Sequence, residues 1–237
     1  MMTLYQFEIS PFCDKIRRVL NVKHVPYVTH EVGLIEGQTS YRKLNPAGKV
    51  PALADDTGRI VCDSTDIAYY LEERFPDPPL VPREPRERAC VHVLEDWADE
   101  SLFFLEMRLR LGTAQSRART FEKLLVREHA LVKALAPWVG SLAVKGQMKA
   151  QGIGRKSDAQ ISTELRRHLD ALAALLSGRE YLVAAGLTLA DIAVYAQLFA
   201  MRDSTEGAAE ITKRPDIVTF MDRVDRATRP VSGSAAA

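Results

Sequence analysis

The hydrophobic period of the chain changes once, near residue 82, and this change constrains the fold most strongly. Up to that point strand-like and helix-like patterns alternate, whereas every later segment has helical period. Strand patterns occupy residues 4–8, 27–32, 51–54 and 59–62, and helical patterns occupy 12–20 and 64–75. A proline-rich stretch at 75–82 separates the two regions and is typical of a stiff linker. The pattern therefore predicts two domains.

The first domain, residues 1–78, is predicted to be α+β, in the order βαβ and then ββα, because strands mixed with helices in a short piece favour a small mixed sheet covered by helices. The second, residues 86–230, is predicted to be an all-α helical bundle. Its expected helices lie near 85–111, 117–135, 158–176, 188–201 and 215–226. The Gly-rich stretch 137–157 is long for a loop, so it is either functional or partly helical.

Composition excludes several classes of function. The net charge of the 237-residue chain is +1 with both signs mixed along it, so we expect no nucleic-acid partner. No apolar run approaches the roughly 18–20 residues that span a bilayer, so we expect no membrane partner. The cysteines, Cys13, Cys62 and Cys90, have neither disulfide-framework nor zinc-ligand spacing, so we expect no metal. A reducing, cytoplasmic compartment suits them.

The string Ser10-Pro11-Phe12-Cys13 follows a strand and opens a helix. Pro11 suits the first helical turn, which places Ser10 at the helix N-terminus, where free N–H groups and the helix dipole favour an anion. A thiolate held there would have a lowered pKa, and the Ser10 hydroxyl could donate a hydrogen bond to it. Alternatively, Ser10 is a plain N-cap and Cys13 a small buried residue.

Two further strings have ligand-binding character. In the first, Lys49-Val50-Pro51, a cis bond before Pro51 would leave the Val50 backbone free to pair with an extended peptide, although an ordinary proline at a strand start explains the string equally well. In the second, Asp63 and Ser64 open a helix, where they could hold an ammonium and a carboxylate or could simply cap it.

Together these strings resemble the glutathione transferase family. The elements are S-P-F-C after the first strand, N-P-x-G-K-V-P-A-L before a hairpin and D-S-x-x-I-x-x-Y-L opening a helix; G-L-T-L-A-D-I-A at 186–193 resembles the capping motif of its helical domain. The resemblance implies a thioredoxin-like first domain, glutathione as co-substrate and a homodimer. It also implies a serine-type site, with Ser10 on the glutathione sulfur and Val50 paired with the peptide. Six residues would bind glutathione: Phe12, Lys49, Val50, a cis Pro51, Asp63 and Ser64.

The implied activity is conjugation of glutathione to a small hydrophobic electrophile. Helical spacing places Trp97, Phe104 and Arg108 near one face, where they could line a pocket for that substrate or form an interdomain core. Two other functions stay open. Cys13 could serve a glutathione-dependent thiol reductase, and the stretch 151–157 faintly resembles metaxin-like and failed-axon-connections-like members, which favours a non-catalytic binding or assembly module.

Overall fold

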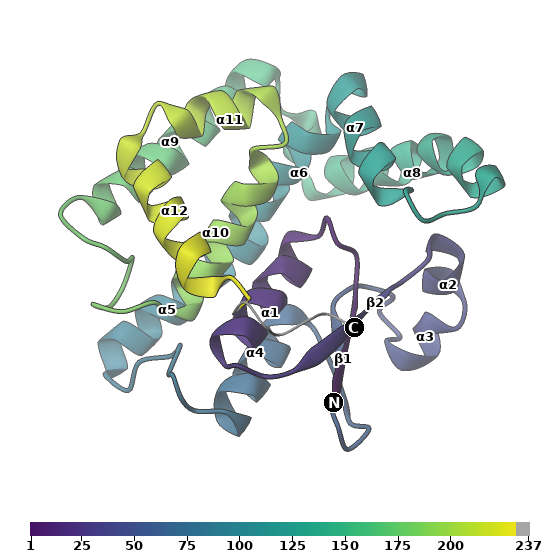
Figure 1. Ribbon diagram of the computed structural model, residues 1–237. Helices are drawn as coiled ribbons and strands as arrows, with labels where there is room; N and C mark the ends of the chain where they lie inside the picture. The colour runs from purple at the N-terminus through teal and green to yellow at the C-terminus, as the bar shows by residue number, and fades with distance from the viewer. Residues whose placement is uncertain (231–237) are drawn as a thin grey trace.

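The computed structural model describes residues 1–230 of the chain. Figure 1 shows a small sheet with its helices in the first part of the chain and a larger group of helices after it. The elements of the first part are β1 (Met2–Gln6), α1 (Pro11–Val22), β2 (Tyr27–Glu31), α2 (Leu34–Gln38), α3 (Tyr41–Leu44), β3 (Ala52–Ala54), β4 (Ile60–Cys62) and α4 (Ser64–Arg74). This order confirms the predicted α+β fold.

The sheet has four strands in the order β2-β1-β3-β4. β1 is parallel to β2 and antiparallel to β3, which is in turn antiparallel to β4. Leu4 of β1 pairs with Leu53 of β3, and both side chains are fully buried. α1 contributes Ile16 and Leu20 to the same core. Helices α2 and α3 were not predicted, because each is too short to show a hydrophobic period.

Helices alone make up the second part. They are α5 (Pro85–Trp97), the π-helical η1 (Ala98–Leu102), α6 (Phe103–Leu111), α7 (Ala114–Leu124), α8 (Ala130–Gln151), the 3-10 turn η2 (Ile153–Arg155), α9 (Asp158–Leu176), α10 (Leu189–Met201), α11 (Thr205–Thr212) and α12 (Pro215–Thr228). None of the helices within residues 1–230 is long and apolar enough to cross a membrane.

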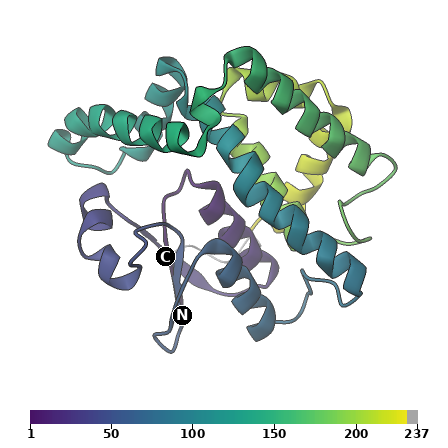
Figure 2. The same ribbon diagram turned by 180° about the vertical axis from the view of Figure 1, so that it is seen from behind.

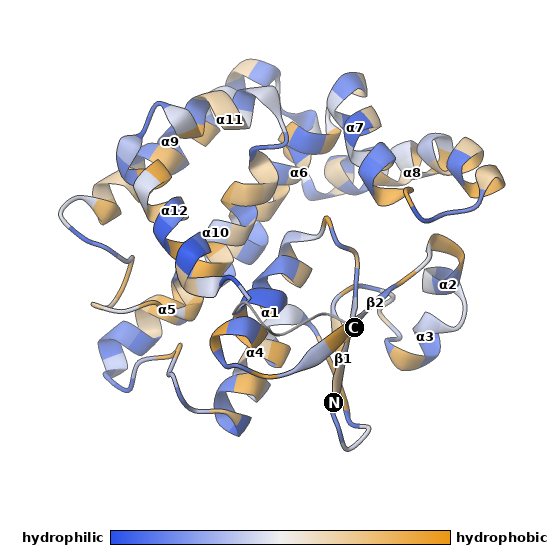
Figure 3. Ribbon diagram, in the orientation of Figure 1, coloured by the Kyte–Doolittle hydropathy of each residue, from blue (hydrophilic) through white to orange (hydrophobic). Residues whose placement is uncertain are grey.

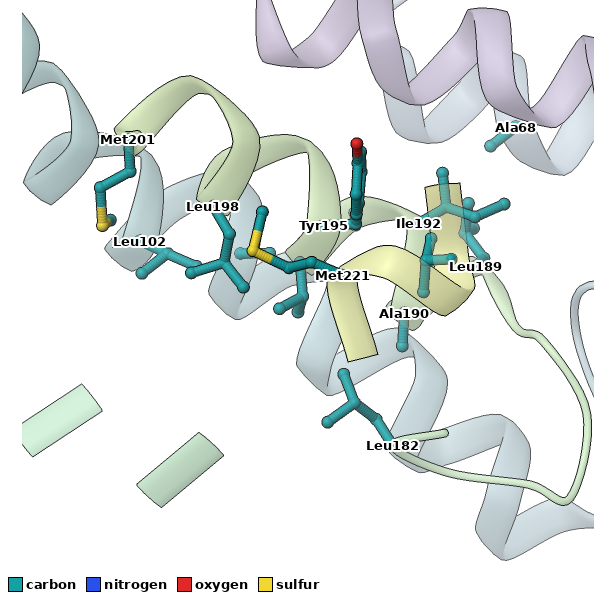
Figure 4. Close-up of a cluster of buried hydrophobic side chains, with 14 of the residues drawn as sticks. Ala68, Leu102, Leu182, Leu189, Ala190, Ile192, Tyr195, Leu198, Met201 and Met221 are labelled. Atoms are coloured by element: carbon teal, nitrogen blue, oxygen red, sulfur yellow. The ribbon is translucent and has the colours of Figure 1, made fainter. Parts of the chain in front are cut away.

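α10 forms the centre of this helical part. All of its residues except Phe199 are buried, and it packs against α1, α5 and α6. Its N-terminus has the predicted capping box, in which the Asp191 carboxylate accepts hydrogen bonds from the N–H and hydroxyl of Thr188 at 2.8 and 2.6 Å. Figure 4 shows the surrounding cluster, in which side chains from α10 meet those of its neighbours: Leu102, Leu182, Leu189, Ile192, Tyr195, Leu198, Met201 and Met221.

The prediction of one helix over 117–135 is wrong. α7 ends at Leu124 and α8 starts at Ala130, with a turn between them. The turn contains neither Gly nor Pro; instead, Glu128 is held by a distant segment, since its carboxylate accepts a hydrogen bond from the N–H of Leu34 at 2.7 Å. A tertiary contact of this kind leaves no periodic signal in the local sequence.

Most of the Gly-rich stretch 137–157 is helical, which settles the alternative left open above in favour of helix. α8 continues through Pro137 to Gln151. Gly140 is required where it stands, because a Cβ there would lie only 2.7 Å from the ring of Phe121 on α7. The glycine at this position therefore permits α7 to pack closely on α8 and does not indicate a loop.

Candidate functional site

Ser10 is the N-cap residue of α1. Its half-buried side chain lies in the turn after β1, and its Oγ accepts a hydrogen bond from the N–H of Cys13 at 3.5 Å. This is the capping role that the sequence allowed. The role uses an acceptor lone pair and leaves the hydroxyl proton free to be donated. The start of α1 can therefore offer an anion both a hydroxyl donor and the positive end of the helix dipole.

Cys13 lies one turn into α1 and is completely buried. Burial raises the pKa of the Cys13 thiol to about 11, against the opposing effect of its hydrogen bond with Ser10. At neutral pH the group is therefore a thiol, whereas nucleophilic attack and disulfide exchange require the thiolate. This position gives no support to a thiol reductase that acts through Cys13.

A pocket of about 430 Å³ opens beside Ser10, between the start of α1 and the ends of α7 and α10. Its wall combines apolar side chains with charged ones, among them Arg17 and an ion pair between Lys123 and Asp203 at 2.8 Å. The lining residues are Glu8, Ile9, Ser10, Pro11, Asp14, Arg17, Lys123, Val126, Ala196, Phe199, Ala200 and Asp203. None of the residues predicted for the second-substrate pocket belongs to this wall.

The loop before β3 has the geometry expected for peptide capture. The Val50–Pro51 bond is cis, as the resemblance implied. The C=O of Lys49 accepts hydrogen bonds from Tyr41 Oη and Asn45 Nδ2, both at 2.7 Å, and these fix the loop while the Lys49 side chain stays exposed. Within the described residues, neither the N–H nor the C=O of Val50 makes a backbone hydrogen bond, so both are open to an extended ligand.

Asp63 and Ser64 lie at the start of α4, but their side chains already have partners. Asp63 caps the helix through the N–H of Thr65 at 2.8 Å and has a φ of 75°, a strained value for a residue other than glycine. The Ser64 hydroxyl is buried and donates to Asp99 at 3.3 Å. The Ser64 hydroxyl therefore has a partner within the protein, and its contact with a ligand stays a prediction.

Beneath Ser64 lies a buried charge cluster that joins the two parts of the chain. The ammonium of Lys15 on α1 contacts Glu95 at 2.6 Å and Asp99 at 2.5 Å. Burial raises the pKa of Asp99 to about 6, although the Lys15 ammonium acts in the opposite direction. Burial also disfavours the Lys15 charge, but the two carboxylates outweigh it and raise the lysine pKa above its usual value. The cluster attaches α1 and α4 to α5 and η1, the elements that carry Glu95 and Asp99.

The residues predicted to hold the second substrate do not gather at Ser10. The ring of Trp97 packs on His168 of α9, with centroids 5.5 Å apart, and Arg108 pairs with Asp158 at 2.6 Å. The ring of Phe104 packs on that of Phe103, with centroids 5.2 Å apart.

Phe103 was missed by the sequence reasoning, although its ring lies 4.6 Å from that of Phe12. Arg17, Lys123, Val126 and Phe199, which line the pocket beside Ser10, were missed as well. The four pocket residues come from α1, α7, α10 and the turn after α7, and only the tertiary structure brings them together. The exposure of Phe199 on the otherwise buried helix α10 is a structural signal that has no counterpart in the local sequence.

Comparison with known proteins agrees with this fold. Residues 4–79 match the family model for the glutathione S-transferase N-terminal domain, and residues 142–227 match that for the C-terminal domain. The chain belongs to the glutathione transferase family. Neither model covers residues 80–141, which include α7 and the first half of α8.

Similar proteins include both transferases and a protein named for its cellular location. FtsZ-localized protein A of Caulobacter vibrioides is 28% identical over 83% of this chain and 75% of its own length. Glutathione S-transferase Z1 of Arabidopsis thaliana is 36% identical over 61% of each chain, so the match spans less than two thirds of that relative. The structure of glutathione transferase F2 from Populus trichocarpa covers 95% of this chain and 93% of its own, at a TM-score of 0.67 and 19% identity, which supports the fold alone.

Proposed function

We propose that this glutathione transferase-family chain conjugates glutathione to a small hydrophobic electrophile, with the Ser10 hydroxyl donating a hydrogen bond to the glutathione thiolate. The observation that carries the proposal is the position of Ser10, at the N-terminus of α1 and at the edge of a 430 Å³ pocket. Phe12, Lys49, Val50, Pro51 and the Asp63–Ser64 turn would hold the tripeptide.

The chemistry assigned to the chain has three parts. The open backbone of Val50 binds the tripeptide in extended form. The Ser10 hydroxyl and the positive end of α1 stabilise the thiolate, which lowers the pKa of the bound thiol toward neutral pH. The pocket beside Ser10 then holds the electrophile near the sulfur, so that a bimolecular reaction becomes effectively unimolecular. The sulfur forms a bond to the electrophilic carbon, whose leaving group departs with the electron pair.

Substitution of Ser10 by Ala tests this role. We expect turnover of a reactive aryl halide to fall roughly 10- to 100-fold, since hydrogen bonds to charged groups contribute about 1.5–3 kcal/mol. Glutathione affinity, measured by calorimetric titration, should change much less, because Ser10 contacts only the sulfur. The ultraviolet absorbance of bound thiolate should titrate at higher pH in the variant than in the wild type.

Ser10→Thr is the matched control, because threonine keeps both the hydroxyl and the capping oxygen. It should retain most of the turnover, whereas Ser10→Asp, which keeps only the cap, should not. Wild-type turnover in Ser10→Ala would remove Ser10 from the mechanism.

A second candidate is a non-catalytic binding or assembly module. It is supported by the similarity to FtsZ-localized protein A and by α7 and the first half of α8, which lie outside the family models. Glutathione binding without turnover of any member of a broad electrophile panel would favour this candidate over the enzyme.

We also propose a homodimer in which the sheet part of one protomer packs on the helical part of its partner. A surface hollow of about 590 Å³ between β4, α4 and α5, lined partly by Tyr69, Tyr70 and Val81, offers a place for that contact. Light scattering coupled to size-exclusion chromatography measures the oligomeric state, and a monomeric mass would contradict the proposal.

A further inference from the structure

α8 carries an exposed apolar stripe along its outer side. Leu131, Leu135, Trp138 and Leu142 are 72%, 56%, 72% and 58% exposed. Their spacing of four, three and four residues places them on one face of the helix. Figure 3 shows hydrophobic residues along α8, at the edge of the molecule. We call these four residues the α8 stripe; a contiguous exposed apolar surface of this kind marks an interaction site.

The stripe is not the face by which α8 joins the fold. The inner side of the helix uses different residues, since Gly140 lies against Phe121 of α7, Pro137 borders a pocket shared with α7, and Met148 is buried. α8 is therefore apolar on both sides while only one of them is covered. A helix that is hydrophobic all round is normally buried.

The charged side chains of α8 itself are all basic. Residues 129–157 contain five basic side chains and no Asp or Glu. Lys145 and Lys149 are exposed and continue the spacing of the stripe, three and seven residues after Leu142. If two copies paired through this face, α8 itself would supply no carboxylate to neutralise the lysines. An anionic partner complements the positive charge of this face.

The shape of α8 favours a lipid surface as that partner. Figures 1 and 2 show α8 extending away from the rest of the helical part, above α2 and α3. A protein partner would need a groove shaped to this helix, whereas lipid chains accommodate it directly. Leucine and tryptophan on one side with flanking lysines are typical of helices that lie in the membrane interface.

The geometry points to α8 as a docking helix that places this protein on an anionic lipid bilayer without crossing it. The α8 stripe enters the interface, and Lys145 and Lys149 contact the lipid phosphates. This inference departs from the expectation of no membrane partner, which rested on the absence of a spanning segment. It is independent of catalysis at Ser10, and its test does not measure turnover.

The test is cosedimentation of the full chain with vesicles of phosphatidylcholine alone or mixed with phosphatidylglycerol. Binding should require the anionic lipid and weaken as salt rises. Trp138→Glu and Leu135→Glu should abolish it. Lys145→Gln with Lys149→Gln should weaken it roughly 30-fold, because each basic residue at such a surface contributes about 1 kcal/mol. In a Trp97→Phe background, the fluorescence of Trp138 should shift to the blue on binding.

Matched controls lie on α9, away from the stripe. Leu175→Glu changes another exposed apolar residue, and Arg166→Gln with Arg167→Gln removes the same charge. Both controls should bind as the wild type does, and circular dichroism should show native folding of every variant. Equal binding to neutral vesicles, undiminished binding by Trp138→Glu, or no vesicle binding by the wild type would overturn the proposal. Self-association that depends on Trp138 without vesicle binding would overturn it in favour of a second copy.

Discussion

At the scale of single residues, the structure gives different environments to Ser10 and Cys13, which lie close together in the sequence. Ser10 is partly accessible beside a pocket, whereas Cys13 is buried and burial raises its thiol pKa to about 11. We therefore expect alkylation of Cys13 by iodoacetamide in the native protein to be at least roughly 100-fold slower than that of exposed Cys90, because the thiolate is the reacting form.

Mass spectrometry of peptides from the alkylated protein measures both rates. The difference should disappear in denaturant, where the two thiols become equivalent, and this serves as the control. Rapid native labelling of Cys13 at neutral pH would show an accessible thiolate and would restore the reductase hypothesis.

At the scale of elements, the start of α10 depends on one buried carboxylate. Asp191 accepts hydrogen bonds from the N–H groups of Leu182 and Thr188, both at 2.8 Å, and so joins the preceding loop to the helix. Asp191→Ala would leave these buried donors unpaired, at about 1–3 kcal/mol each. We expect a loss of about 2–5 kcal/mol in the free energy of unfolding, measured by urea denaturation.

Asp191→Asn is the matched variant, since its amide oxygen retains an acceptor for one of the two N–H groups. It should lose less stability than Asp191→Ala. Unfolding of Asp191→Ala at the wild-type urea midpoint would mean that water or a shifted backbone satisfies these donors.

At the scale of the whole molecule, buried ionic contacts join the sheet part to the helical part. Besides the cluster at Lys15, Arg18 of α1 contacts Tyr195 of α10 and Asp225 of α12. Lys15→Met would leave the carboxylates of Glu95 and Asp99 buried without a cation. We expect a loss of about 3–5 kcal/mol, the usual effect of removing one partner of a buried pair.

The pH dependence of this loss has a definite sign. Burial raises the pKa of Asp99 to about 6, and Lys15→Met removes the ammonium that acts against this rise. The Asp99 charge therefore destabilises the variant above that pKa, and protonation relieves the loss below it. The loss should therefore shrink as the pH falls toward about 5. Lys213→Met is the control: it removes an exposed lysine, while Arg214 still pairs with its partner Glu210, and it should change stability by less than about 1 kcal/mol. A loss of stability that does not depend on pH would mean that altered packing, and not the buried charge, destabilises Lys15→Met.

Unfolding followed by two signals tests whether the parts behave as one unit. Trp97 and Trp138 both lie in the helical part, so fluorescence reports on that part alone, whereas circular dichroism reports on the whole chain. Coincident transitions in the wild type are expected if the ionic contacts couple the parts.

Much of the fold was predictable from local signals. The helices with strong apolar faces, such as α1 and α9, and the capping box at Thr188 were found because their signals lie within a few neighbouring residues. The break between α7 and α8 was not, because Glu128 is held by Leu34, far away in the sequence. Of the site, Ser10 and the cis Pro51 turn could be placed by their motifs, whereas the inward direction of the Ser64 hydroxyl could not.

The sequence by itself determined the order of the strands and main helices of the sheet part, the family and the position of Ser10 at a helix start, because periodicity, capping and turn preferences act over short distances. The tertiary structure alone decided which side chains surround Ser10, that Trp97 faces α9, and that one side of α8 is left uncovered. Those features depend on how helices pack across the whole chain, and packing joins residues that no local pattern relates.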